Sequence, residues 1–229
     1  MGQQVFSIAI DGPSAAGKST IAKAISQRTG ALYLDTGAMY RALGLHALNV
    51  RVDMADFEAI AAAMADACIE VAYQGDEQRM YLNGSDVTDA IRRPDVSVAA
   101  SAVSAVPAVR EEMVRMQRHI ASGQRCVLDG RDIGTKVLPN ATLKIFLVAD
   151  PEIRALRRHR ELVERGGQDD YDAVLREMLQ RDHDDRTRAA SPLVKAQDAV
   201  ELNATHLSIA EVAQAVIELL DERMGGIDA

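Results

Sequence analysis

The sequence predicts an α/β protein built on a five-stranded parallel sheet that helices wind over on both faces. Five short, almost uninterrupted apolar runs are spaced along the chain, and stretches with helical patterns lie between most of them. A third observation is a block of a different kind, in which turn-forming residues separate short strand-like segments. With 229 residues, the chain has room for one such domain and a small inserted subdomain.

The expected parallel strands are the apolar runs at residues 5–10, 31–34, 126–129, 143–149 and 199–204. A glycine-containing loop and a helical pattern over residues 18–28 follow the first run, and a helix from about residue 38 follows the second. The runs are continuous rather than alternating, which is typical of parallel strands covered on both faces. A doubly wound sheet is therefore expected.

The block that interrupts this rhythm begins at Cys68. Its segments CIEVAY, QRMYL and SDVT are separated by QGDE and by Asn83-Gly84, which favour tight turns. This pattern predicts a small antiparallel hairpin or meander, followed by helical pieces bounded by Pro94 and Pro107. We expect residues 66–106 to form the inserted subdomain and residues 1–65 and 107–229 to form the core.

Composition limits the classes of partner. The net charge of −8 and an isoelectric point near 5.2 argue against a nucleic-acid polymer, although a local group of arginines could still bind a small anion. No apolar run is long enough to cross a membrane, and the N-terminus lacks a signal-peptide pattern. We therefore expect a soluble cytoplasmic protein. Cys68 and Cys126 have no metal-type or redox spacing, and we expect both to be inert buried thiols.

The stretch GPSAAGKS, residues 12–19, fits the phosphate-loop pattern and lies between a predicted strand and a predicted helix. Its backbone amides and the start of the following helix would hold phosphate groups. Lys18 would reach the β- and γ-phosphates, and the Ser19 hydroxyl would ligate Mg²⁺. A glycine-rich turn that merely caps a helix is the alternative. Since no N-K-x-D motif occurs, a small kinase or a nucleotide-sensing switch fits better than a GTPase.

Between Pro151 and Ala190 the chain has arginines but no lysine. A planar guanidinium binds phosphate oxygens in a forked geometry, and phosphoryl transfer needs positive charge spread over several oxygens, often under a closing lid. For most of these arginines, a solvated helix face with salt bridges remains the alternative. The arginines are Arg154, Arg157, Arg158, Arg160, Arg165, Arg176, Arg181, Arg186 and Arg188.

Arg181, Asp185 and Arg188 are spaced so that they would share one face of a helix. Asp185 could accept a hydrogen bond from a ribose hydroxyl, and the two arginines could face phosphate or sugar oxygens. An ion pair within the helix, without a ligand, is the alternative.

A second anion site is suggested by LDTGAMYR, residues 34–41. Thr36 and Gly37 stand where a helix begins, so a phosphate could bind the amides there, with Arg41 within reach. Alternatively, Asp35 and Thr36 simply cap the helix. Two phosphate sites fit a donor nucleotide and a phosphorylated acceptor.

Asp129, Arg131 and Asp132 crowd around a glycine at the end of the third parallel strand. Together, IDGPSAAGKST, LDTGAMYR, Ser101, Arg110, DGRDIGTKVLP, LKIFL and RDHDDRTRAASPL resemble the bacterial cytidylate kinase family, in order, from about residue 5 to about residue 220. The resemblance implies a monomeric nucleoside monophosphate kinase that converts ATP and CMP (or dCMP) to ADP and CDP (or dCDP) with Mg²⁺. It makes residues 66–106 the NMP-binding insertion and residues from about 155 to 190 the lid.

The resemblance also implies roles for single residues. Ser101, Arg110 and Asp132 would read the cytosine; Arg41 and Arg131 would hold the acceptor phosphate beside Thr36. Arg181 and Asp185 would bind the sugar, and Arg188 would bridge sugar and phosphate. The expected CMP-binding residues are Thr36, Arg41, Ser101, Arg110, Gly130, Arg131, Asp132, Arg181, Asp185 and Arg188. The expected ATP-binding residues are Gly12, Pro13, Ser14, Ala15, Ala16, Gly17, Lys18, Ser19, Thr20 and Arg157. The expected catalytic residues are Lys18, Asp129, Arg131 and Arg188.

No general base is expected, because the attacking phosphate oxygen has a second pKa of about 6 and is largely ionised at neutral pH. We therefore expect Asp129 to contact the metal ion through a metal-bound water molecule. Another monophosphate kinase, for UMP or AMP, is one alternative. A nucleotide-binding regulatory module is another, but it should show a degraded acceptor site, and Arg41, Arg131, Arg181 and Arg188 are all present.

Overall fold

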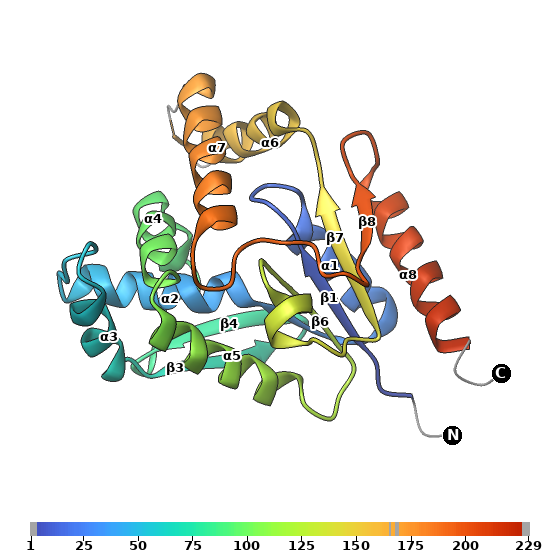
Figure 1. Ribbon diagram of the computed structural model, residues 1–229, viewed down its shortest axis with the longest axis horizontal. Helices are drawn as coiled ribbons and strands as arrows, with labels where there is room; N and C mark the ends of the chain where they lie inside the picture. The colour runs from blue at the N-terminus through green and yellow to red at the C-terminus, as the bar shows by residue number, and fades with distance from the viewer. Residues whose placement is uncertain (1–3, 165, 168–169, 226–229) are drawn as a thin grey trace. The chain divides into compact units, whose positions relative to one another are not determined.

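The computed structural model describes residues 4–164, 166–167 and 170–225 (Figure 1). The chain divides into two compact units. The first combines the chain up to Leu32 with the chain from Gly123 onward, and the second is Tyr33–Ser122. The expected insertion, residues 66–106, lies within the second unit; its boundaries and its role stay predictions. None of the described helices is both long enough and apolar enough to span a membrane.

The main sheet has the strand order β2-β6-β1-β7-β8, which confirms the predicted five-stranded parallel sheet. Its strands are β1 (Ser7–Asp11), β2 (Leu32–Asp35), β6 (Cys126–Gly130), β7 (Leu143–Val148) and β8 (Val200–Asn203). Each strand lies within one of the expected apolar runs or extends one residue past its end. The pairs β1–β6, β1–β7 and β7–β8 are all parallel.

The middle strand β1 is buried on both faces, which explains its continuous apolar sequence. Ile8 and Ala9, whose side chains point to opposite faces of the sheet, are both inaccessible to solvent. Helices α1 (Lys18–Thr29) and α8 (Ile209–Gly225) contact each other and cover one face of the sheet with side chains such as Ile25 and Val216. The parallel register sets Asp11 opposite Gly130. The loop after β1 and the segment after β6 therefore leave the sheet at neighbouring carboxyl ends, where α/β sheets bind ligands.

Gly12, the first residue of the phosphate loop, passes very close to the neighbouring strand. Its φ of +152° is rarely adopted by other residues, and a Cβ atom built on it would lie 2.1 Å from the carbonyl oxygen of Leu147 in β7. Any larger residue would therefore push the loop off the end of the sheet.

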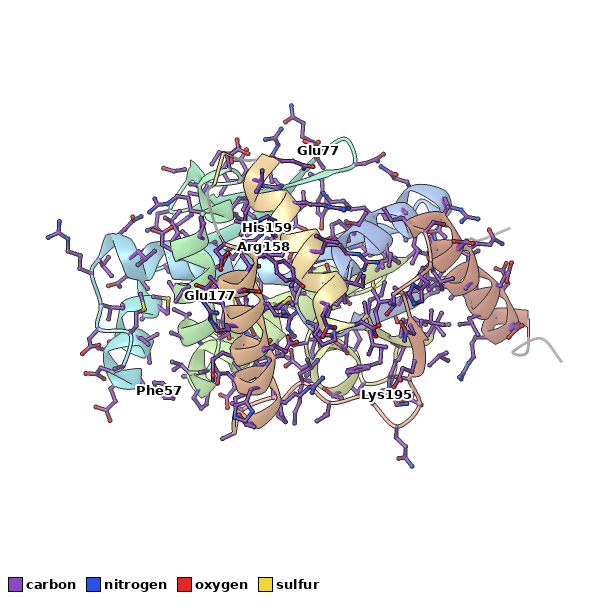
Figure 2. The ribbon with its side chains drawn as sticks, turned by 90° about the horizontal axis from the view of Figure 1, so that it is seen from above. Phe57, Glu77, Arg158, His159, Glu177 and Lys195 are labelled. Carbon is purple, nitrogen blue, oxygen red and sulfur yellow. The ribbon has the colours of Figure 1, made fainter. Side chains whose placement is uncertain are left out.

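Helices α6 (Pro151–Glu164) and α7 (Tyr171–Thr187) pack against each other. The rings of His159 and Tyr171 meet edge to face with centroids 6.1 Å apart, and the Tyr171 hydroxyl donates to the carbonyl of Glu152 at 3.3 Å. Arg158 forms a partly exposed ion pair with Glu161 at 2.9 Å, as a salt-bridged helix face predicts. Figure 2 labels Arg158 and His159 on α6.

The second unit combines helices with the small sheet predicted from its turn residues. Its helices are α2 (Thr36–Asn49), α3 (Phe57–Ala65), η1 (Ala90–Arg92), α4 (Pro94–Val103) and α5 (Pro107–Ala121). Its antiparallel strands are β3 (Ile69–Gln74), β4 (Glu77–Leu82) and β5 (Ser85–Asp86), in that spatial order. This arrangement confirms the predicted antiparallel meander.

The two cysteines differ in their surroundings. Cys126 lies in β6, and burial raises the pKa of its thiol to about 11, as an inert thiol predicts. The prediction was wrong for Cys68, which is exposed. Burial alternates along β3 from Ile69 onward, and Cys68 falls on the exposed side of that alternation.

Gly44 sets how closely α2 approaches α4 within the second unit. A Cβ atom at this position would lie 2.6 Å from the amide nitrogen of Ala100 and 3.0 Å from the carbonyl oxygen of Val96. We expect Gly44→Ala to force the helices apart and to lower the free energy of unfolding by about 1–3 kcal/mol. Urea denaturation followed by circular dichroism measures this loss. Gly225→Ala is the matched control, because nothing lies within 4 Å of its added Cβ; an equal loss there would contradict the steric explanation.

Candidate active site

The phosphate loop joins β1 to α1, and Lys18 is the first residue of that helix. Its side chain is buried and its Nζ donates to the carbonyl of Pro13 at 2.7 Å. Burial lowers the pKa of Lys18 from 10.5 to about 7, and Arg131 adds to this shift, whereas the carboxylate of Asp129 opposes it. A buried cation in this state gains stability from an anion placed beside it. Lys18 thus meets the electrostatic requirement for a phosphate ligand.

Ser19 and Asp129 bring two hard oxygen atoms together at the loop. The Ser19 hydroxyl donates to Oδ2 of Asp129 at 2.9 Å, and Asp129 is buried at the end of β6. Hydroxyl and carboxylate oxygens suit Mg²⁺, which usually keeps several waters and binds substrate phosphates besides one or two protein groups. Among the described residues no cluster of three or more His, Cys, Asp or Glu side chains forms a metal cage. The oxygen atoms of Ser19 and Asp129 are of the kind that suits Mg²⁺ bound together with a nucleotide.

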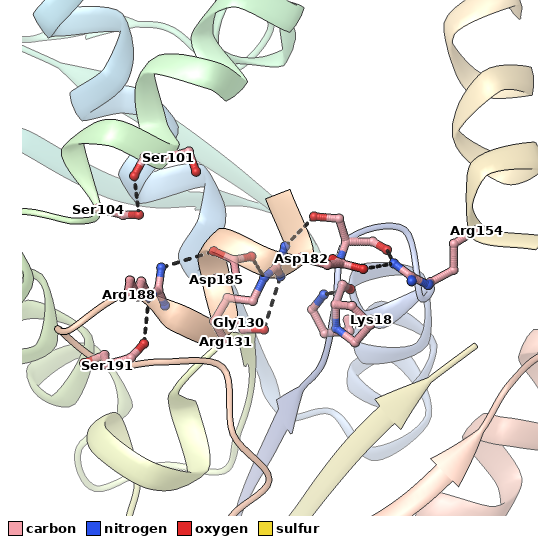
Figure 3. Close-up of polar contacts among 12 residues, drawn as sticks. Lys18, Ser101, Ser104, Gly130, Arg131, Arg154, Asp182, Asp185, Arg188 and Ser191 are labelled. Carbon is pink, nitrogen blue, oxygen red and sulfur yellow. Dashed lines mark hydrogen bonds and ion pairs between the residues drawn. The ribbon is translucent and has the colours of Figure 1, made fainter. Parts of the chain in front are cut away.

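Arg131 follows β6 and connects the phosphate loop to α7 (Figure 3). Its Nη2 donates to the Ser14 hydroxyl, and its Nε donates to Oδ2 of Asp185, both at 2.7 Å. Burial alone would raise the pKa of Asp185, but Arg131, helped by Arg188, holds that pKa below its usual value. The guanidinium is thereby fixed in orientation next to the loop.

The start of α2, in the second unit, holds the other predicted anion site. Asp35 caps the helix: its Oδ1 accepts from the amide of Ala38, and its Oδ2 accepts from Nη2 of Arg41, both at 2.8 Å. Thr36 is buried at the first helical position. The capping alternative is thus realised by Asp35, and the same carboxylate holds Arg41 at the helix start. A phosphate-binding role for Thr36 and Arg41 stays a prediction.

Two of the three predicted cytosine-reading residues, Ser101 and Arg110, are both hydrogen-bonded to Ser104 within the second unit. The Ser104 hydroxyl donates to the carbonyl of Ser101 at 2.9 Å, and Nη1 of Arg110 donates to the carbonyl of Ser104 at 2.9 Å. Arg110 is buried and its guanidinium lies 5.3 Å from the ring centroid of Tyr40. Asp132 is buried in the first unit. The joint use of the three residues therefore stays a prediction.

A family model described as cytidylate kinase matches residues 8–222. A cytidylate kinase of Geobacillus thermodenitrificans (strain NG80-2) is 50% identical over 218 residues, covering 95% of this chain and 97% of the relative. A cytidylate kinase of Bacillus subtilis (strain 168) is 45% identical over 221 residues, covering 96% and 99%. This chain belongs to the cytidylate kinase family.

Membership in the cytidylate kinase family confirms both the predicted family and the predicted enzyme class, a phosphotransferase. Among solved structures, a shikimate kinase from Bacteroides thetaiotaomicron is similar with a TM-score of 0.50 and 14% identity, covering 94% of this chain and 98% of that one. At this identity the similarity shows the fold alone, a phosphate-loop kinase sheet flanked by helices.

Helix α7 ends before Arg188, although the spacing of Arg181, Asp185 and Arg188 predicts that all three lie on it. Arg181 and Asp185 lie on the helix, but α7 ends at Thr187, and Arg188 is the cap residue with a non-helical ψ of 142°. The prediction of one helical face was therefore wrong for Arg188. Its Nε donates to the carbonyl of Ser191 at 2.8 Å, and its Nη1 lies 3.3 Å from Oδ1 of Asp185. The turn after the helix, rather than helical periodicity, directs Arg188 back to Asp185.

Arg154, one of the nine arginines named above, forms a buried ion pair beside the phosphate loop with Asp182, which the sequence did not single out. Nη1 of Arg154 lies 2.6 Å from Oδ2 of Asp182 and donates to the carbonyl of Ser14 at 3.1 Å. The amide of Ser14 donates to Oδ1 of Asp182 at 3.4 Å. In this cytidylate kinase fold, side chains of α6 and α7 therefore form hydrogen bonds directly with the backbone of the loop. A usable signal was present: Asp182 and Asp185 are three residues apart on a polar helix and would share a buried face.

Arg157, expected at the ATP site, donates to the carbonyl of Ala204 at 2.8 Å in the segment after β8. This contact orients the side chain along the end of the sheet, and its role in binding ATP stays a prediction. Arg165, another of the arginines singled out in the sequence, lies outside the described residues.

Proposed function

We propose that this protein transfers the γ-phosphoryl group of ATP to CMP or dCMP, forming ADP and CDP or dCDP. The observation that carries the proposal is the contact between Nη2 of Arg131 and the Ser14 hydroxyl at 2.7 Å. It sets a guanidinium suited to an acceptor phosphate directly against the loop suited to the donor phosphates. Membership in the cytidylate kinase family supports cytosine as the acceptor base.

The reaction needs positioning and charge rather than a base. An ionised oxygen of the CMP phosphate forms the new bond to the γ-phosphorus as the bond to the β,γ-bridging oxygen breaks, and ADP leaves with that electron pair. Lys18, Arg131 and Arg188 are assigned to stabilise the negative charge on the oxygens of the phosphoryl group while it is transferred. Ser19 and, through water, Asp129 would hold Mg²⁺, which when bound neutralises charge on the donor phosphates.

The remaining assignments concern recognition of the acceptor. Cytosine presents an amino group and acceptor atoms, which suit the carboxylate of Asp132 and the donors of Arg110 and Ser101. Thr36, Arg41 and the backbone at Gly130 are assigned to the phosphate, and Arg181 with Asp185 to the sugar. An acidic chain with arginines gathered at one site fits a small nucleotide of the cytoplasm better than a nucleic-acid polymer.

A coupled assay of ADP release tests the proposal with CMP, dCMP, UMP and AMP as acceptors. We expect rapid turnover with CMP and dCMP and little with AMP, and we expect Asp132→Ala to reduce the use of CMP by about 10- to 100-fold. Faster turnover of AMP than of CMP would overturn the assignment in favour of another monophosphate kinase. ATP binding without ADP release for any acceptor would instead indicate a regulatory module.

A further inference from the structure

Asp11 is a buried carboxylate at the end of β1, immediately before the phosphate loop, and none of the roles proposed above uses it. Only 4% of its surface is accessible. Its Oδ1 accepts from the amide of Ile133 at 2.8 Å, and its Oδ2 accepts from the amide of Gly134 at 2.7 Å. Both oxygens are thus committed to the turn that follows Arg131 and Asp132, more than 120 residues away in the chain.

The two amides belong to the first residues of η2 (Ile133–Val137), a single turn of π-helix. Amides at the start of a helix have no partner within it, and an aspartate at the N-cap position usually accepts from them. Asp132 occupies that position, yet its side chain makes no capping hydrogen bond to η2. Asp11 supplies these acceptor oxygens from the neighbouring strand.

We infer that Asp11 is a positioning residue, which anchors the turn from Arg131 to Gly134 to the phosphate loop and so sets the place of the Asp132 carboxylate for cytosine. The inference rests on the proposed function, in which Asp132 reads the base. The register of the sheet supports it, because Asp11 pairs with Gly130 and thus joins the start of the donor loop to the start of the acceptor turn.

Burial disfavours the charged form of the carboxylate at this position. Burial raises the pKa of Asp11 to about 6, and the nearby charge of Asp132 adds to this rise. The hydrogen bonds from the amides of Gly134 and Ile133, and the charge of Lys18, oppose it. Lys144 on β7 also lies against this turn, but its Nζ pairs with Asp198 at 2.8 Å. A group held at such a cost, with both oxygens given to one turn, is best explained by the geometry that it imposes.

The test is Asp11→Asn, which keeps the shape but offers one acceptor oxygen and turns an NH₂ group toward the other amide. We expect KM for CMP to rise about tenfold and the preference for CMP over UMP to fall about tenfold, while KM for ATP changes by less than about twofold. Asp11→Glu keeps the charge but displaces the oxygens by one methylene, and should show the same CMP-selective change. Thermal melts establish that each variant is folded.

Lys144→Met is the matched control, because it removes a buried polar group beside the same turn without touching its amides. It should lower the melting temperature and leave the ratio of the two KM values unchanged. Equal changes in KM for CMP and for ATP in Asp11→Asn, or a CMP-selective change in Lys144→Met, would reduce Asp11 to a structural role and overturn the inference.

A double mutant separates this inference from the proposed function. If Asp11 acts through Asp132, adding Asp11→Asn to Asp132→Ala should not change the CMP-to-UMP preference further. A further loss in the double mutant would overturn the positioning role. Failure of the unmodified protein to phosphorylate CMP would overturn the proposed function itself. An effect of Asp132→Ala on base preference without any effect of Asp11→Asn would overturn this inference alone.

Discussion

Replacing Lys18 with methionine should lower kcat by on the order of 10³, because the substitution removes the buried cationic group that belongs to the donor loop itself. The methionine side chain fills much of the same space, so the loop keeps its packing while the phosphoryl oxygens lose their cation. Lys18 is 6% exposed, and in such a site a charge acts through little intervening water. Single-turnover measurement of ADP formation with saturating ATP and CMP gives the rate of the chemical step.

Lys23→Met provides the matched control for this change, since Lys23 is an exposed lysine on the same helix. It should leave kcat within about twofold, as expected for a surface position. If Lys18→Met keeps more than about a tenth of the wild-type kcat, or if Lys23→Met loses as much, the assignment of Lys18 to transition-state charge is wrong.

The sequence predicted the sheet well because local patterns determine most of it. Each parallel strand is a short apolar run, and burial on both faces is what makes such runs continuous. The phosphate loop could also be predicted, because its glycines stand at positions where the backbone disfavours any larger residue. Gly12, for example, passes within van der Waals distance of β7. The glycine pattern itself spans only a few neighbouring residues, although the contact that explains it for Gly12 is with Leu147 on a distant part of the chain.

The predictions missed contacts made by residues that are far apart in the chain. Asp11 contacts amides 122 and 123 positions away, and Arg154 pairs with an acid 28 positions away on the next helix. A single sequence can mark one such residue, as the spacing of Asp182 and Asp185 does, but it contains no pattern that links the two partners. Arg188 was misplaced for a different reason: no glycine or proline marks the end of α7 at Thr187, and the first proline after it is Pro192.

Arg131→Lys should lower kcat/KM for CMP by on the order of 10³, although it conserves the positive charge. The guanidinium reaches Asp185 with its Nε and the Ser14 hydroxyl with its Nη2 at the same time, and an ammonium group on a different stem cannot meet both. Asp185 is buried and would lose its best partner, so its pKa should rise toward the value that burial alone favours. Steady-state kinetics with varied CMP at saturating ATP, and the reverse, measure the loss.

Arg115→Lys makes the same substitution in a surface ion pair with Glu112, where the arginine side chain is 73% exposed, and it should leave all kinetic constants within about twofold. The relative changes in kcat and in KM for CMP then show whether Arg131 acts in substrate binding, in the chemical step or in both. Because the side chain touches the donor loop and is assigned to the acceptor phosphate, both kcat and KM for CMP should change. A rise in KM for CMP alone would restrict Arg131 to ground-state binding of the acceptor. Activity close to wild type would show that charge suffices here and that the forked contact of Arg131 does not matter for transfer.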